Sequence, residues 1–178
     1  MGLSGNRDRG RLVETSHRAP SSAPLAGIRT ARQHESDSLR EIHRRASYIW
    51  PEDVRNLDAN PDIFGVDPAA IAAGRVRVAF DTNGNPLGFA SWRPSREDAE
   101  LEDLFVEPHA MRHGIGTALV EDAAECARHA GLVRLLVVAH PRTLAFYRRA
   151  GFVEQGPAET RFGPALRLAR DLAEASRH

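Results

Sequence analysis

The chain has 178 residues, and its 24 basic (Lys and Arg) and 24 acidic (Asp and Glu) side chains give a formal net charge of zero. A neutral chain argues against the basic surface that binds a nucleic-acid backbone. No apolar run approaches the ~20 residues of a membrane span, so we expect neither a nucleic-acid nor a membrane partner. The single cysteine, Cys126, cannot form an internal disulfide, and the N-terminus lacks the apolar segment of a signal peptide. We therefore expect a cytoplasmic protein.

The N-terminal residues differ from the rest in composition. Residues 1–24 are rich in Arg, Ser, Gly and Pro and show no hydrophobic period, so we predict a disordered or loosely docked arm. Residues 25–178 are expected to form a single domain, because a chain of ~150 residues can bury about 68–70% of its unfolded surface.

The first half of this domain is predicted to contain a helix and antiparallel strands. Alternating apolar residues indicate strands at 75–80 and 87–92, and the Asn-Gly pair between them is typical of a hairpin turn. A capped helix is expected to start at Ser36. The segment 48–67, rich in aromatic residues and proline, is expected to be a loop. The other short elements are a strand at 28–31 and a helix at 68–73, capped by Asp67.

The second half reads as alternating strands and helices. A helix over 117–130 connects a strand near 101–106 to the continuous apolar run 134–139, which indicates a parallel crossover. We predict an α/β (α+β) fold with a mixed, mostly antiparallel central sheet flanked by helices. The expected buried stripe of the helix comprises Ile115, Leu119, Val120, Ala123 and Ala127, and the remaining elements are a helix at 141–150 and strands at 152–154 and 165–170.

A glycine turn stands between that strand and that helix, with the sequence Gly114-Ile-Gly116. The first backbone N–H groups of a helix lack internal partners and carry partial positive charge, and glycines allow an anion to approach the backbone closely. The pattern indicates a phosphate or pyrophosphate site. A tight turn without any ligand produces the same pattern.

The strand before the turn shows a break in its alternation. Leu101 and Leu104 would lie on opposite faces of a regular strand, and Phe105 would return to the side of Leu101. Such a slip permits a β-bulge, which frees backbone N–H and C=O groups. A strand that is buried on both faces is the alternative.

Several short motifs stand together in one order. Val106-x-Pro108, the glycine turn, Phe146-Tyr147 and Gly151-Phe152 resemble the GNAT superfamily of acyl-CoA N-acyltransferases. The resemblance covers roughly residues 26–172 and implies a splayed parallel strand pair with acetyl-CoA as the acyl donor. Two positions depart from the family pattern: Met111 stands where Gln or Arg is usual, and His140 where Asn is frequent.

The resemblance implies which residues hold the cofactor. The pantetheine arm would bind the backbone of the splayed strand, and the pyrophosphate would lie against the loop, where Met111 contributes packing only. Arg112 and His113 would add positive charge there, or they are solvated loop charges. The implied cofactor-binding residues are Leu104, Phe105, Val106, Met111, Arg112, His113, Gly114, Ile115, Gly116, Thr117, His140 and Phe146.

Two residues have catalytic roles in this interpretation. The resemblance implies that Tyr147 donates a proton or hydrogen bond to the departing thiolate; a tyrosine whose hydroxyl binds the backbone is the alternative. The amine acceptor must lose a proton before it attacks, because its pKa is about 10.4. The resemblance implies Glu100 as the base, directly or through water, and Glu102 lies on the same face if the strand is regular there. The acidic cluster Glu97, Asp98, Glu100, Glu102 and Asp103 could equally be a solvated strand end.

The predicted function is transfer of an acetyl group to a primary amine of a small molecule or peptide, by direct attack in a ternary complex. A non-catalytic acyl-CoA sensor is the alternative, and the resemblance also allows a homodimer. A Rossmann-type nucleotide binder is disfavoured because the glycine turn follows the fourth strand. No metal site is expected, since the histidines lack paired ligand spacing. Candidates for the acceptor pocket are Trp50, Phe64, Trp92, Arg161 and Phe162.

Overall fold

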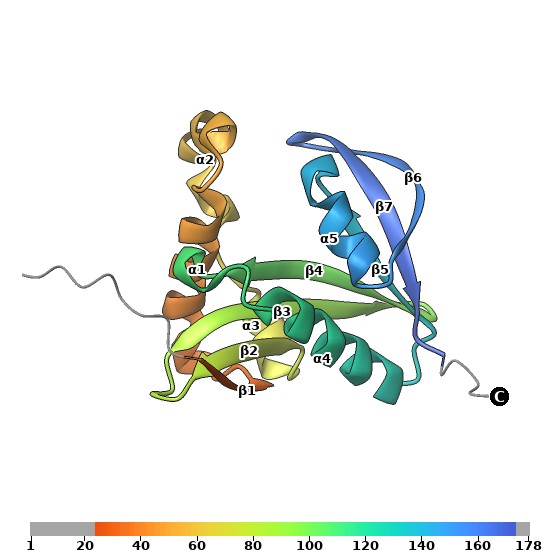
Figure 1. The fold of residues 1–178 in the computed structure, drawn as a ribbon, viewed down its shortest axis with the longest axis horizontal. Helices are drawn as coiled ribbons and strands as arrows, with labels where there is room; N and C mark the ends of the chain where they lie inside the picture. Colours follow the sequence, from red (N-terminus) through yellow and green to blue (C-terminus); the bar gives the residue numbers. More distant parts are fainter. Residues whose placement is uncertain (1–23, 174–178) are drawn as a thin grey trace, which may run out of the picture.

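The protein is described by a computed structural model that covers residues 24–173. The predicted arm therefore lies outside the described residues, except for its last position. Seven strands form one sheet in the order β1-β2-β3-β4-β5-β7-β6 (Figure 1), and β4–β5 is its parallel pair. The other neighbours are antiparallel, which confirms the predicted mixed sheet. The strands are β1 (Leu25–Thr30), β2 (Val76–Asp81), β3 (Pro86–Ser95), β4 (Asp98–Val106), β5 (Arg134–Ala139), β6 (Val153–Thr160) and β7 (Gly163–Asp171).

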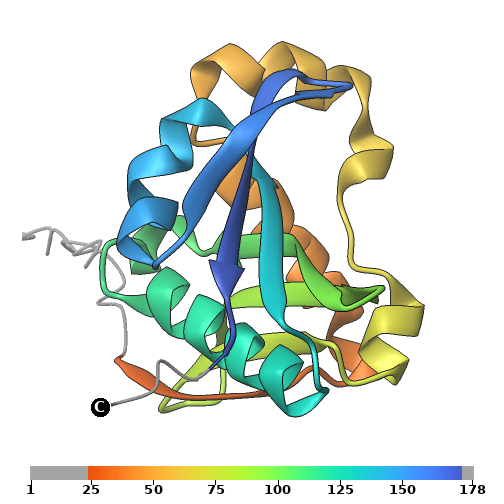
Figure 2. The same ribbon diagram turned by 90° about the vertical axis from the view of Figure 1, so that its right-hand side faces the viewer.

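Helices cover both faces of the sheet (Figures 1 and 2). Helix α4 (Ile115–His129) packs on β2, β3 and β4, and the predicted stripe of the helix is buried. Helix α1 (Ser36–Ser47) packs on the opposite face of β3 and β4. The two faces give two apolar cores, because neighbouring residues of β3 point in opposite directions: Ala90 packs in the core beneath α4, and Phe89 in the core beneath α1.

The segment 48–67 was expected to be a loop, and this prediction is wrong. It contains α2 (Val54–Ala59) between two 3-10 turns, η2 (Pro51–Asp53) and η3 (Pro61–Ile63). Each proline occupies the first position of its turn, where the missing N–H costs nothing. Helix α2 buries a single residue, Leu57, so its sequence carries little hydrophobic period. Helix α3 (Pro68–Ala72) follows, and its predicted cap is confirmed: Asp67 accepts a hydrogen bond from the Ala69 N–H at 2.9 Å.

Strand β4 contains the bulge that its sequence permitted. Ser91 of β3 pairs with Asp103, and Trp92 pairs with Leu101, so Glu102 is the extra residue. The bulge brings Leu101 and Leu104 into the same core under α4. Phe105 packs instead against the core under α1, so the expectation that it shares the side of Leu101 is wrong. The inserted residue shifts the alternation by one position.

Strands β4 and β5 part soon after they meet. Their parallel pairing is limited to Ala99 with Leu135 and Glu100 with Leu136, although β4 continues to Val106. The last residues of β4 therefore have no β5 partner along one edge. Figure 1 shows α1 and α2 rising on one side of this opening, and α5 (Leu144–Arg149) with the β6–β7 hairpin on the other.

Candidate active site

A cavity of about 760 Å³ lies where β4 and β5 separate. Its floor includes the end of β4 and the end of β5. One wall comes from α1, η2 and α2, and the other from α5 and the β6–β7 hairpin. The glycine loop before α4 closes one side. The cavity thus joins segments that the sequence separates by about a hundred positions.

The glycine loop lines this cavity with Met111, Arg112, Gly114, Gly116 and Thr117. Gly114 is the N-cap of α4 with a φ of 80°, and Arg112 also has a positive φ, 63°. Within residues 24–173, no side chain caps the start of α4, so its first N–H groups have no side-chain partner there. Successive N–H groups in such a turn form a concave site for anions, and the helix dipole adds to its positive potential.

The structure brings together most of the predicted cofactor-binding residues. Two of them do not line the cavity: Ile115 is 3% exposed and packs in the core, and the His113 Nδ1 atom lies 3.3 Å from the Ala110 carbonyl oxygen. The residues that do line it are Leu104, Phe105, Val106, Met111, Arg112, Gly114, Gly116, Thr117, His140 and Phe146.

Tyr147 also lines the cavity, and its hydroxyl group has no partner among the described residues. Its ring makes edge contacts with Phe146 and Phe152, at centroid distances of 5.0 and 5.3 Å. Within the described part of the chain, no residue forms a hydrogen bond with the hydroxyl, so the alternative of a backbone-bound tyrosine is not observed. Burial raises the pKa of Tyr147 to about 12. The phenol is therefore protonated near neutral pH and can donate to a bound group.

His140 has a structural role in addition to its place in the cavity. Its Nδ1 atom accepts a hydrogen bond from the Arg142 N–H at 3.2 Å and caps the 3-10 turn η5 (Pro141–Thr143). In the neutral ring this bond leaves the proton on Nε2. The ring can thus donate one hydrogen bond from Nε2.

The acidic cluster lies apart from the cavity lining. Glu100 and Glu102 both form ion pairs with Arg93, the second at 2.7 Å. Asp103 accepts a hydrogen bond from the Ser91 hydroxyl, and burial raises the pKa of this carboxyl. The two predicted catalytic residues therefore do not share the cavity: Tyr147 lines it, whereas Glu100 does not.

Both walls contribute residues that sequence reasoning missed. His43 of α1 stacks on Phe105 at a centroid distance of 3.9 Å, and burial lowers its pKa. Arg142 forms ion pairs with Glu52, at 3.1 Å, and with Asp53. These partners lie some 90 positions apart in sequence, so no local pattern could have indicated the contact.

The acceptor-pocket candidates divide into two groups. Trp50 and Phe162 line the cavity. Phe64 and Trp92 are buried, at 8% and 6% exposure, and Arg161 stacks on Phe162 without lining the cavity.

Residues 24–173 contain no group of three or more His, Cys, Asp or Glu side chains that could hold a metal ion. Within the same range, no helix combines the length and the apolarity needed to cross a membrane.

Comparison with known proteins identifies the family. A family model described as "Acetyltransferase (GNAT) domain" matches residues 72–154. The glucosamine 6-phosphate N-acetyltransferase of Trypanosoma brucei brucei is 30% identical over 111 residues, which are 54% of this chain and 76% of that enzyme. The chain belongs to the GNAT acetyltransferase superfamily. The splayed strands and the glycine turn are thus the GNAT features of the fold.

Other GNAT relatives are similar over different shares of their length. An uncharacterized N-acetyltransferase of Methanocaldococcus jannaschii is 39% identical over 85 residues, which are 42% of this chain and only 38% of that protein. The solved structure of the PaiA N-acetyltransferase from Thermoplasma acidophilum, in complex with coenzyme A, has a TM-score of 0.62. It is 18% identical, and the match covers 82% of this chain and 98% of that one, which supports the GNAT fold.

Proposed function

We propose that this protein transfers an acetyl group from acetyl-CoA to a primary amine of a small molecule or peptide. The observation that carries the proposal is the composition of one cavity. This one cavity is lined by the open edge of β4, by the glycine turn at the start of α4 and by Tyr147. Within residues 24–173, the Tyr147 hydroxyl has no hydrogen-bond partner. These are a site for an amide-containing arm, a site for an anion and a proton donor.

The cofactor would lie along these features in order. Its pyrophosphate would accept hydrogen bonds from the N–H groups of residues 112–117, with Arg112 adding charge. Its pantetheine arm would pair with the free backbone edge of Leu104–Val106, which β5 leaves open. Phe146 would pack against this arm, and its ring lies next to Gly116 at the start of α4.

The proposed chemistry is a direct acyl transfer that uses Tyr147 as the proton donor and Glu100 as the proton acceptor. The neutral amine nitrogen attacks the thioester carbonyl carbon, and the C–S bond breaks as the amide forms. Tyr147 donates a proton or hydrogen bond to the departing sulfur. We propose that the proton lost by the amine passes through water to Glu100, since this carboxylate does not line the cavity. Solvent then returns a proton to the Tyr147 phenolate.

Two measurements test the proposal. Calorimetry measures the binding of CoA and acetyl-CoA, and an assay for free thiol measures CoA release with a panel of primary amines. Binding together with amine-dependent release supports the enzyme. Binding without release for any amine would instead support a non-catalytic acyl-CoA sensor, and the absence of binding would contradict both.

The proposal includes a cytoplasmic location and allows a homodimer. Sedimentation of the purified chain measures the oligomeric state. A homodimer that forms with and without CoA would be an assembly independent of the cofactor.

A further inference from the structure

Charge divides the cavity into two parts. Arg112 and Arg149 line it, and neither has a carboxylate partner within residues 24–173. Arg112 belongs to the glycine loop and Arg149 to the last turn of α5, the elements that the proposed function assigns to the cofactor. The phosphates of CoA carry several negative charges, so these two cations are matched by the cofactor itself.

The remaining charged group bridges the two walls, because Arg142 lies in η5, directly before α5, whereas Glu52 and Asp53 lie in η2. Arg142 forms ion pairs with Glu52 and Asp53, so one cation faces two carboxylates. The three side chains together carry one excess negative charge. An ammonium group is attracted to such a cluster, whereas a phosphate or carboxylate is repelled by its excess negative charge.

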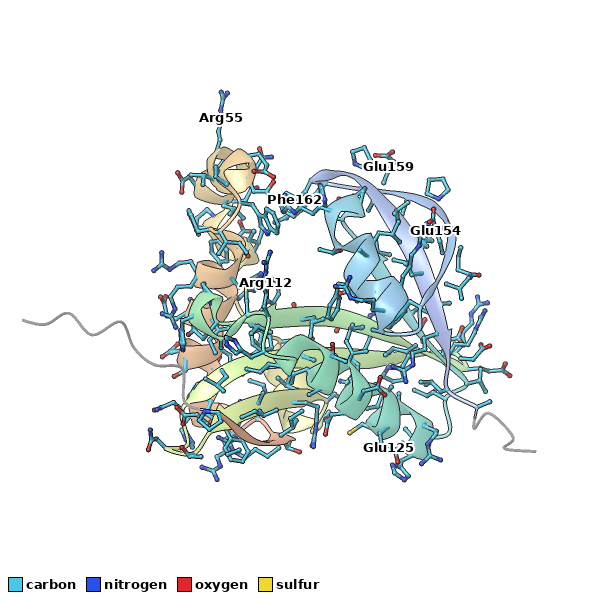
Figure 3. The ribbon with its side chains drawn as sticks, viewed as in Figure 1. Arg55, Arg112, Glu125, Glu154, Glu159 and Phe162 are labelled. Atoms are coloured by element: carbon cyan, nitrogen blue, oxygen red, sulfur yellow. The ribbon has the colours of Figure 1, made fainter. Side chains whose placement is uncertain are left out.

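Apolar side chains are exposed beside this cluster. Ile49, Trp50 and Phe162 line the cavity, and they are 38%, 37% and 48% exposed. They come from both walls: Ile49 and Trp50 lie between α1 and η2, whereas Phe162 lies at the tip of the β6–β7 hairpin. Figure 3 shows the Phe162 side chain pointing from the hairpin toward α2, across the opening.

Trp50 is fixed in its position by Arg142. The Arg142 guanidinium lies 4.2 Å from the centre of the Trp50 ring, and the same guanidinium binds the two carboxylates. A cation–π contact of this kind orients the indole. Arg142 is therefore a positioning residue, and its Nε–H is buried without a hydrogen-bond partner in the described chain.

From these observations we propose the class of the acceptor, an inference that rests on the proposed function. The acceptor is a small primary amine with a flat, apolar, aromatic body and no phosphate or carboxylate. Its body packs between Trp50 and Phe162, and its ammonium is attracted by the excess charge of Glu52 and Asp53 before it loses a proton. A phosphorylated amino sugar, the acceptor named for the trypanosomal relative, does not fit this charge balance.

A panel of five amines tests the class. 2-Phenylethylamine should exceed propylamine in kcat/KM on the order of 10-fold or more, because it buries an aromatic ring at the same amine. Phenylalanine should be poorer than 2-phenylethylamine because of its carboxylate, and glucosamine 6-phosphate should be poor as well. Equal values for the first two amines, or a preference for the sugar phosphate, would overturn the proposal. A phenylalanyl peptide that surpasses 2-phenylethylamine would overturn the small-molecule assignment.

Two variants test whether the preference for an aromatic amine comes from Trp50 and Phe162, the two side chains of the proposed clamp. Trp50→Ala and Phe162→Ala should each reduce the ratio of kcat/KM between 2-phenylethylamine and propylamine, with the KM for acetyl-CoA unchanged. Val153→Ala removes an apolar side chain that is 65% exposed and lies outside the cavity, and it should leave the ratio unchanged. An unchanged ratio in both clamp variants would contradict the assignment.

Measurements of amine binding test the acceptor class separately from the proposed acetyl transfer. Calorimetry of the protein saturated with CoA should detect 2-phenylethylamine more strongly than propylamine, and Trp50→Ala should weaken the difference. This result would support the acceptor class even if no acetyl transfer occurred. Acetyl transfer to other amines, with no binding preference for the ring, would support the function and reject the class.

Discussion

Gly116 lies directly against Phe146. A Cβ atom at position 116 would stand 3.3 Å from Cε2 of Phe146 and 3.9 Å from Cγ2 of Val106. The first turn of α4 therefore touches both α5 and the end of β4. Any side chain at this position would push into the space between the glycine loop and the free edge of β4, where the proposed cofactor path runs.

Gly116→Glu should abolish most cofactor binding. The new side chain adds bulk next to Phe146 and a negative charge beside the proposed pyrophosphate site, so we expect acetyl-CoA affinity to fall on the order of 100-fold. Gly116→Ala adds bulk without charge, so it should reduce acetyl-CoA affinity less than Gly116→Glu does. Val153→Glu places the same charge on an exposed position outside the cavity and serves as the control. Calorimetry measures the acetyl-CoA affinity of all three variants. A wild-type affinity in Gly116→Glu would reject the proposed pyrophosphate site.

Tyr147→Phe should slow the reaction without weakening the protein. The hydroxyl has no protein partner within residues 24–173, so its removal should leave the Tm nearly unchanged. Because the raised pKa of about 12 keeps the phenol protonated, it can donate throughout the neutral range. We expect kcat to fall on the order of 10²-fold, with little change in acetyl-CoA affinity.

Tyr48→Phe provides the matched control for this variant. The Tyr48 hydroxyl donates to Asp58 at 2.5 Å, and its side chain does not line the cavity. This control should keep the wild-type kcat. A wild-type kcat in Tyr147→Phe, where chemistry limits the rate, would exclude the proton-donor role.

The sequence predicted the elements that depend on local patterns and missed those that depend on distant contacts. The stripe from Ile115 to Ala127 repeats with helical spacing, so α4 was predictable, and the glycine turn marked its start. The ion pair of Arg142 with Asp53 joins two 3-10 turns that no periodic pattern relates. The position of Glu100 outside the cavity depended on the bulge at Glu102 and on Arg93, a partner on the neighbouring strand.

Glu35 should stabilise the fold near neutral pH and lose this effect in acid. Arg29 donates two hydrogen bonds to its carboxylate, at 2.8 and 2.5 Å, and the Arg32 N–H donates a third at 2.8 Å. The hydrogen bonds from Arg29 and the Arg32 N–H, with the positive charges of both arginines, outweigh the opposing effect of burial and hold the pKa of Glu35 below its usual value. The carboxylate therefore favours the folded state above the unfolded pKa of about 4.3. This contribution disappears as the pH falls through the folded pKa.

Thermal denaturation of Glu35→Gln tests this pH dependence. The variant should melt below the wild type at about pH 7, and the difference should shrink at about pH 3. Glu41→Gln is the control, since Glu41 is a half-exposed partner of Arg44 on the surface of α1 and should contribute little. A difference in Tm that is the same at both pH values would show that Glu35 acts through packing rather than charge.

The last prediction concerns deprotonation of the amine. Glu100 and Glu102 share Arg93, so removal of either carboxylate leaves the arginine with a partner and should preserve the strand. Glu100→Gln should raise the pH at which kcat/KM reaches its plateau, or lower the plateau, because the attacking amine must lose its proton. Acetyl-CoA affinity should stay unchanged, and Glu102→Gln should have the smaller effect if Glu100 is the base. Glu97→Gln, in the turn before β4, is the control. If neither strand variant alters the pH–rate profile, the cluster acts only as a solvated strand end and the proton leaves through water or another group.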